Sequence, residues 1–85
     1  MISFMCTVED EHGIHARPAA AIAAIVKKYD CAVTVEANGK SCDAAGVIGL
    51  MSLGAAEGTR LTVRAAGPEG RKALAALSDY MKENL

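Results

Sequence analysis

The segment VTVEANGKSCD, residues 33–43, carries the strongest short hairpin signal in the chain. Apolar and polar side chains alternate from Val33 to Ala37, which is the pattern of a half-buried strand. Asn38-Gly39 follows, and this pair is typical of the tight turn of a β-hairpin because both residues accept a positive φ. Residues 40–43 would form the returning strand. The segment therefore predicts an antiparallel hairpin.

The rest of the chain divides into strands and helices on either side of this hairpin. Apolar residues recur with period two in residues 2–8 and 61–65, which predicts two more strands. Helical spacing predicts helices that start at Ala16, at Val47 and at Pro68-Glu69. The predicted order is β-α-β-β-α-β-α, and its most economical packing is an α+β, two-layer open sandwich. The pattern alone does not settle the strand order.

The composition predicts a small globular protein. At 85 residues the chain is expected to form one domain, residues 1–85. A net charge of −1, with no basic run longer than Lys27-Lys28, argues against a nucleic-acid partner. The longest apolar run, residues 19–26, is shorter than the roughly 20 residues that a membrane helix needs. Because the N-terminal segment also lacks the pattern of a signal peptide, we expect a cytoplasmic protein that is not inserted in a membrane.

The segment Gly13-Ile14-His15-Ala16-Arg17-Pro18 points to chemistry. His15 falls where a loop enters the first predicted helix. The first amides of a helix lack helical partners, and the helix dipole places positive charge there, so such an end binds anions such as phosphate. The same field favours a neutral imidazole with a lone pair for attack. A phosphoryl group on His15 would meet the Arg17 guanidinium and the backbone amides near Ala16 and Arg17.

Two other interpretations of these residues carry less weight. One is an exposed cap histidine beside an unrelated arginine, but the grouping of Gly, His, Arg and Pro at one helix entry favours the phosphoryl site. The other is a metal site, since His12 lies three residues before His15 and Cys6 is upstream. A structural zinc site needs four ligands at better-defined spacing, so no metal or other cofactor is expected. The three cysteines form no CxxC pair and are expected to be buried, reduced thiols.

The segment GIHARPAA, residues 13–20, closely resembles the active-site segment of HPr, the histidine-containing phosphocarrier of the bacterial phosphoenolpyruvate:sugar phosphotransferase system. Asn38-Gly39-Lys40 and GLMSLG, residues 49–54, also match the family at similar spacings, so the resemblance covers essentially the whole chain. It implies an antiparallel four-stranded sheet of order 1-4-2-3 with three helices on one face. It also implies that enzyme I, charged by phosphoenolpyruvate, phosphorylates Nδ1 of His15, and that the A domain of an enzyme II accepts the group for sugar uptake. The chain would then be a monomeric carrier and not an enzyme that turns over alone.

The resemblance further implies an apolar docking face around the histidine, formed by the first helix and the short second helix. The matching positions are Ala16, Arg17, Ala20, Ala24, Lys27, Val47, Ile48, Gly49, Met51 and Ser52. Without the family, the apolar residues of the second helix could belong to the core. A short helix buries only one face, however, so some of these side chains should be exposed. Ala24 and Gly49 stand where lysines can occur in relatives, so fewer basic side chains are expected around this docking face.

Gly46 departs from many Gram-positive relatives, which carry a regulatory serine at this place as the target of a dedicated kinase and phosphatase. Glycine can cap the helix but offers no hydroxyl, so this serine switch is predicted to be absent. Ser41 and Ser52 lie nearby but do not occupy the matching position. Two alternative functions stay open. One is a regulatory HPr-like binding module that acts on a metabolic enzyme or transcription factor, and the other is a carrier for a nitrogen-linked or dihydroxyacetone-kinase branch.

Overall fold

The structure of this chain is a computed structural model that describes residues 2–85. Its elements are β1 (Ile2–Thr7), α1 (Ala16–Val26), β2 (Ala32–Ala37), β3 (Lys40–Asp43), α2 (Val47–Ser52), β4 (Arg60–Ala66) and α3 (Gly70–Asn84). The predicted order of strands and helices is confirmed. Several boundaries differ by one or two residues: β1 ends at Thr7 and not at Val8, and β4 extends one residue beyond the predicted strand at each end. Helix α3 begins at Gly70, because Glu69 has the non-helical backbone of an N-cap. The Glu69 carboxylate accepts a hydrogen bond from the Asp30 amide at 2.7 Å.

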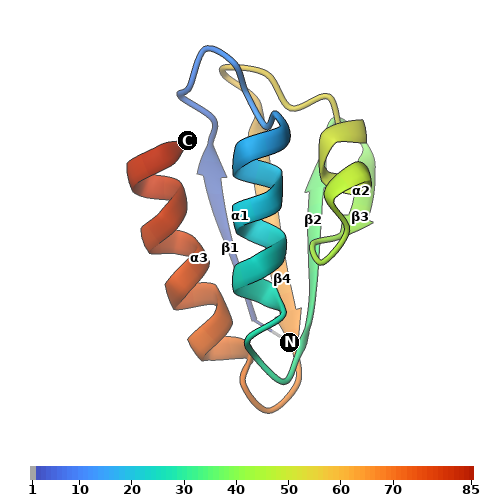
Figure 1. Cartoon of the computed structure of the whole chain (residues 1–85), viewed down its shortest axis with the longest axis vertical. Coiled ribbons are helices and arrows are strands. Elements are labelled where there is room, and N and C mark those ends of the chain that lie inside the picture. Colours follow the sequence, from blue (N-terminus) through green and yellow to red (C-terminus); the bar gives the residue numbers. More distant parts are fainter. Residues whose placement is uncertain (1) are drawn as a thin grey trace.

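The four strands form one antiparallel sheet in the order β1-β4-β2-β3. Strand β4 lies between β1 and β2, so Val63 pairs with Phe4 on one side and with Val35 on the other. All three helices lie on one face of this sheet (Figure 1). The predicted two-layer sandwich is therefore confirmed, and so is the strand order that the family resemblance implied.

The turn between β2 and β3 has the backbone that the sequence predicts. Asn38 and Gly39 both have positive φ, 54° and 76°, as the tight turn of a hairpin requires. The Asn38 side chain has a second role that is not local. Its Nδ2 donates hydrogen bonds to the main-chain oxygens of Leu53 and Gly54, at 3.1 and 3.2 Å. The tip of the hairpin is thereby held to the end of α2.

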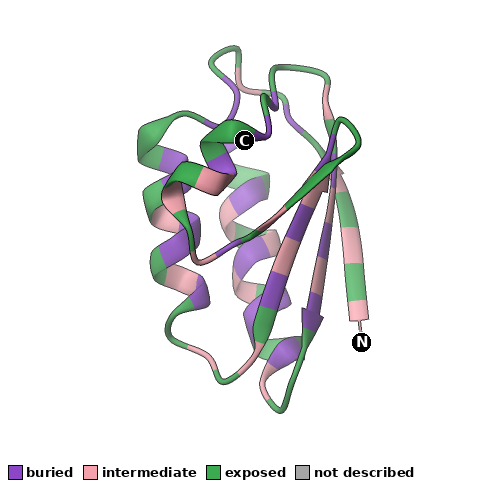
Figure 2. Cartoon of the chain, turned by 90° about the vertical axis from the view of Figure 1, so that its right-hand side faces the viewer, coloured by how far each residue is buried: buried purple, intermediate pink, exposed green. Residues whose placement is uncertain are grey.

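The core lies between the sheet and the helices. Buried and less buried residues alternate along β2 and β4, and the buried stripes of the helices face the sheet (Figure 2). Each helix contributes a fully buried aliphatic side chain: Ile22 from α1, Leu50 from α2 and Leu77 from α3. Complete burial of such a side chain is worth about 1.5–3 kcal/mol relative to exposure. These stripes therefore position the helices on the sheet.

The three cysteines are free thiols, but each is only half-buried, so the predicted burial is wrong. Cys6 and Cys42 lie on β1 and β3, the two edge strands, where neighbouring strands cover a side chain on one side only. Within residues 2–85, no helix is both long and apolar enough to cross a membrane.

Candidate functional site

The loop between β1 and α1 reaches His15 through a short turn. The Gly13 amide donates to the main-chain oxygen of Asp10 at 3.0 Å, and the His12 amide donates to Oδ1 of the Asp10 side chain at 2.7 Å. An Asp side chain that accepts the amide two residues on is a common way of stabilising a turn. The turn therefore positions His12, and the residues that follow it, against the start of α1.

Gly13 makes the close approach on which this loop depends. Its φ is +64°, and a Cβ at this position would overlap the main-chain oxygen of Ala55 and lie 3.0 Å from Cα of Ala56. The next residue, Ile14, is buried, and its amide donates to the same Ala55 oxygen at 3.0 Å. Only glycine fits here, because the position needs both a left-handed backbone and the absence of a side chain. The loop is thus fastened to the segment after α2.

His15 is the N-cap of α1, as the sequence predicts. Its backbone is extended, with φ −99° and ψ −170°, and its side chain makes no capping hydrogen bond. Its main-chain oxygen accepts the Ala19 amide at 3.0 Å, which closes the first helical turn. The side chain is exposed. An imidazole that is exposed and free of capping bonds is accessible to a reacting group from outside the molecule.

The amides of Ala16 and Arg17 are the donors beside this imidazole. Neither has a hydrogen-bond acceptor among residues 2–85, as expected for the first amides of a helix. Pro18 occupies the first turn without loss, because it has no amide hydrogen. The Arg17 guanidinium is exposed, and no carboxylate in the described part of the chain lies within ion-pair distance of it. The helix entry therefore combines two unengaged amides, a free guanidinium and the dipole of α1, which together suit an anion.

His12 lies against His15, which sequence reasoning considered only as a metal pair. The two ring centroids are 5.8 Å apart and the ring planes are nearly perpendicular, at 80°. Nε2 of His12 is 3.5 Å from Oε1 of Glu11, and both side chains are largely exposed. The three-residue spacing was the available signal, but the approach of the rings depends on the turn at Asp10. Across residues 2–85, no group of three or more His, Cys, Asp or Glu side chains is arranged to hold a metal ion.

The predicted docking positions fall on two neighbouring helices, since α1 and α2 pack against each other (Figure 1). We call their exposed members the α1–α2 face: Ala16, Arg17, Ala20, Ala24, Lys27, Ile48, Met51 and Ser52. Ile48 is 80% exposed and Met51 44% exposed, whereas Leu50 is fully buried. The prediction that α2 exposes part of its apolar surface is confirmed. Val47 and Gly49 are only half-buried, so they border this face.

Two positions at the ends of α2, Ser52 and Gly46, bear on the serine switch. Ser52 donates its hydroxyl to the main-chain oxygen of Ile48 at 2.8 Å, within the helix. Gly46 is the N-cap of α2, with φ −104° and ψ 114°. A Cβ there would lie 3.5 Å from the Asp43 oxygen, which is an ordinary contact. The backbone at position 46 would accept a serine, so the glycine is not required by the fold.

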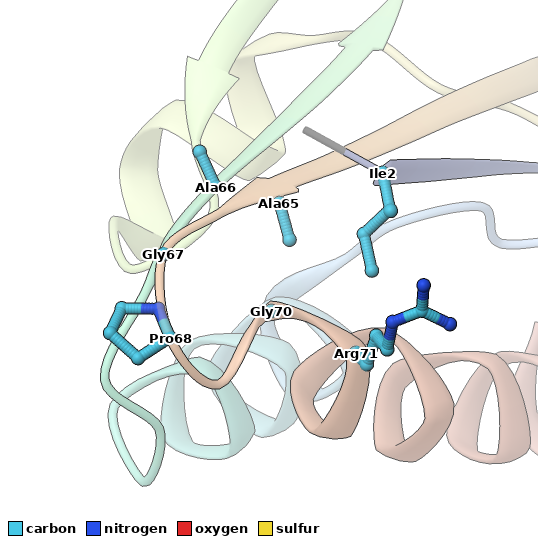
Figure 3. Close-up of a pocket in the computed structure, with 7 residues that line it drawn as sticks. All are labelled: Ile2, Ala65, Ala66, Gly67, Pro68, Gly70 and Arg71. Carbon is cyan, nitrogen blue, oxygen red and sulfur yellow. The ribbon is translucent and has the colours of Figure 1, made fainter.

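A hollow of about 170 Å³ lies elsewhere, where β4 turns into α3 (Figure 3). It is lined by Ile2, Ala65, Ala66, Gly67, Pro68, Gly70 and Arg71. This connection is at the end of the molecule opposite to the start of α1 (Figure 1). Two further hollows lie between β1 and α3 and along β2 and β4. None of the predicted site residues lines any of the three, so the exposed surface around His15 is the candidate site.

Comparisons with known proteins agree with one another. A family model described as "PTS HPr component phosphorylation site" matches residues 2–83. The phosphocarrier protein HPr of Vibrio cholerae serotype O1 is 40% identical over 74 residues, which cover 84% of this chain and 87% of that protein. The crystal structure of HPr-C-His from Thermoanaerobacter tengcongensis has a TM-score of 0.92 at 30% identity, and the match covers 98% of this chain and 93% of that one. An HPr dimer from the same organism matches with a TM-score of 0.77 at 30% identity, over 98% of this chain and 95% of that one.

Proposed function

This chain belongs to the HPr family, the phosphocarriers of the phosphotransferase system, and from that premise we propose that His15 is the residue that carries the phosphoryl group. The observation that carries the proposal is the position of His15. Its exposed ring stands at the positive end of α1, beside the unengaged amides of Ala16 and Arg17. Those donors would meet the oxygens of an attached phosphoryl group.

The transfer step follows from the chemistry of a neutral imidazole. The lone pair of Nδ1 attacks the phosphorus atom of the donor, and an N–P bond forms. The bond between phosphorus and the donor group breaks, and its electron pair stays with that group. The proton on Nε2 is then free to leave to solvent. The Arg17 guanidinium and the two amides stabilise the charged oxygens during transfer, which is the main demand that phosphoryl transfer makes on a protein.

We propose enzyme I, charged by phosphoenolpyruvate, as the donor and the A domain of a sugar-specific enzyme II as the acceptor. Both would dock on the α1–α2 face, where Ile48 and Met51 offer exposed apolar surface on the helix that packs against α1. The protein would work in the cytoplasm as a single domain, residues 1–85, and as a monomer. It would carry phosphate without catalysing turnover alone, and it would need no metal or cofactor.

The absence of the serine switch is part of this proposal. Gly46 offers no hydroxyl, and the Ser52 hydroxyl is engaged within α2. Incubation with the serine kinase of a Gram-positive relative and ATP should leave the protein unmodified. The Gly46→Ser variant is the matched positive control, because the backbone at this position accepts a side chain. Phosphoserine within residues 40–53 of the unaltered protein would contradict the proposal.

Phosphorylation by enzyme I tests the main proposal. Incubation with enzyme I and phosphoenolpyruvate should add one acid-labile phosphoryl group, measured by intact mass. His15→Ala should abolish the addition, whereas Ser41→Ala, which removes an exposed hydroxyl on β3 outside the α1–α2 face, should leave it unchanged. Full labelling of His15→Ala would refute the assignment. A transfer assay against acceptors of the sugar, nitrogen-linked and dihydroxyacetone-kinase branches then identifies the branch. Capture of a partner that depends on phosphorylation without any transfer would favour the regulatory binding module instead.

A further inference from the structure

The ring of His12 lies close to the ring of His15, the proposed phosphoryl carrier. The two rings meet edge to face, with centroids 5.8 Å apart, and both side chains point into solvent. The position of His12 is set by two hydrogen bonds to Asp10, one from its own amide and one from the amide of Gly13. Gly13 in turn abuts Ala55. The imidazole is therefore held beside His15 by its backbone, although its ring is exposed.

The loop that carries His12 is rich in acidic residues, so a phosphoryl group on His15 would add negative charge to an acidic region. Glu9, Asp10 and Glu11 precede it on the same loop, and Glu57 follows the Ala55 segment on which the loop rests. The amides of Glu9 and Asp10 bind the main-chain oxygen of Leu85 at the end of the chain. Arg17 is the cation on α1. A phosphoryl group carries between one and two negative charges near neutral pH, so its arrival adds to an acidic surrounding.

We propose that His12 is a second imidazole of the phosphoryl site, which in its protonated form donates a hydrogen bond to the phosphoryl oxygens on His15 and so stabilises the phosphorylated carrier. This inference rests on the proposed function of His15. Histidine is the side chain that ordinarily gains its charge between pH 5 and 8, so the stabilisation is present at the acidic end of that range and absent at the alkaline end. Oε1 of Glu11, at 3.5 Å from Nε2 of His12, is a competing acceptor for that nitrogen.

The proposal is tested by phosphoryl exchange between two forms of the protein. Phosphorylated wild type is mixed with an unphosphorylated variant, enzyme I is added in catalytic amount, and intact mass gives the distribution at equilibrium. Because the measurement is an equilibrium, effects of His12 on docking cancel. With His12→Asn, the wild type should hold about three- to tenfold more of the phosphoryl group at about pH 6, the range expected for one exposed charge-assisted hydrogen bond. The ratio of phosphorylated wild type to phosphorylated variant should approach one at about pH 8.5, where an ordinary histidine is uncharged.

Two further variants separate charge from structure. His12→Lys keeps a cation at both pH values, so it should match the wild type at low pH and hold more phosphoryl group than the wild type at high pH. Lys28→Gln removes a cation beyond the far end of α1, an 11-residue helix about 16 Å long, and should give a ratio near one throughout because salt screens charges over about 8–10 Å. A ratio near one for His12→Asn at about pH 6 overturns the proposal. A loss that is independent of pH and is not rescued by His12→Lys overturns it as well.

A second measurement does not need enzyme I, so it distinguishes failure of this inference from failure of the proposed function. The protein is phosphorylated chemically with potassium phosphoramidate, and the phosphorus-31 resonance of phosphohistidine is followed against pH. An imidazolium beside the phosphoryl group favours its dianion, so the titration of that resonance should lie at lower pH in the wild type than in His12→Asn, by about half a unit. Coincident titration curves overturn the role of His12 even where enzyme I does not act on the protein.

Discussion

Replacement of Gly13 by alanine should damage the candidate site and the fold together. Gly13 has φ +64°, which costs a residue with a Cβ roughly 1–2 kcal/mol. The added methyl group would also overlap the main-chain oxygen of Ala55. Relief of this overlap moves the loop off that oxygen and breaks the hydrogen bond from the Ile14 amide, 3.0 Å in the native structure. Overpacking of this kind typically costs about 1–3 kcal/mol. The free energy of unfolding should therefore fall by about 2–5 kcal/mol in total.

Gly54→Ala is the matched control for this substitution. Gly54 has nearly the same φ, +66°, but nothing lies within 4 Å of an added Cβ. It should lose only the backbone contribution, about 1–2 kcal/mol. The difference between the two variants isolates the contact with Ala55 from the left-handed conformation.

Urea unfolding at neutral pH measures both variants, followed by the rate of phosphorylation by enzyme I. Proteins of this size have free energies of unfolding of about 4–13 kcal/mol. Both variants should therefore still be folded without urea when the measurement is made at reduced temperature. With m near 1 kcal/mol/M, the midpoint of Gly13→Ala should lie about 1 M or more below that of Gly54→Ala. Phosphorylation should slow in Gly13→Ala only, because His15 follows the displaced loop. Equal midpoints for the two variants would refute the argument that Ala55 excludes a side chain at position 13.

Three further outcomes are expected. Ile48→Asp should weaken binding of enzyme I in calorimetry but change the free energy of unfolding by less than about 0.5 kcal/mol, since Ile48 is 80% exposed, whereas Leu50→Ala on the buried side of α2 should cost about 2–5 kcal/mol. Arg17→Ala should slow phosphoryl transfer about tenfold, and Arg17→Lys less, because the charge is kept while the planar fork of donors is lost. Burial raises the pKa of the Cys6 thiol, so in the unfolded chain this thiol loses its proton at lower pH than in the native protein. Native stability from this thiol should thus be present below the ordinary thiol pKa and be lost as pH rises through the raised value, and a urea midpoint that falls less steeply with pH in Cys6→Ala than in wild type would confirm it.

Much of the fold was predictable because its signals are local. Asn38-Gly39 sets its own turn through the φ values that these residues tolerate, and alternation in residues 33–37 marks the strand before it. The position of His15 at the start of α1 was predictable for the same reason, since Pro18 and the alanines that follow favour a helix that begins at Ala16. The role of α2 was open, because every apolar residue in it was a candidate for burial. Packing on the sheet decided that Leu50 is buried and Ile48 is exposed.

The sequence by itself determined the elements, their order, and the histidine at a helix entry beside an arginine. These features depend on backbone preferences and on periodicity within a few neighbouring residues, so they can be predicted without knowledge of distant parts of the chain. Only the tertiary structure decided that Gly13 lies against Ala55 and that α1 and α2 share a face. It also decided how closely the rings of His12 and His15 approach, since that distance depends on a loop fastened to another segment. These contacts join residues that are not related by any local backbone preference. They meet only when the helices and the sheet pack together.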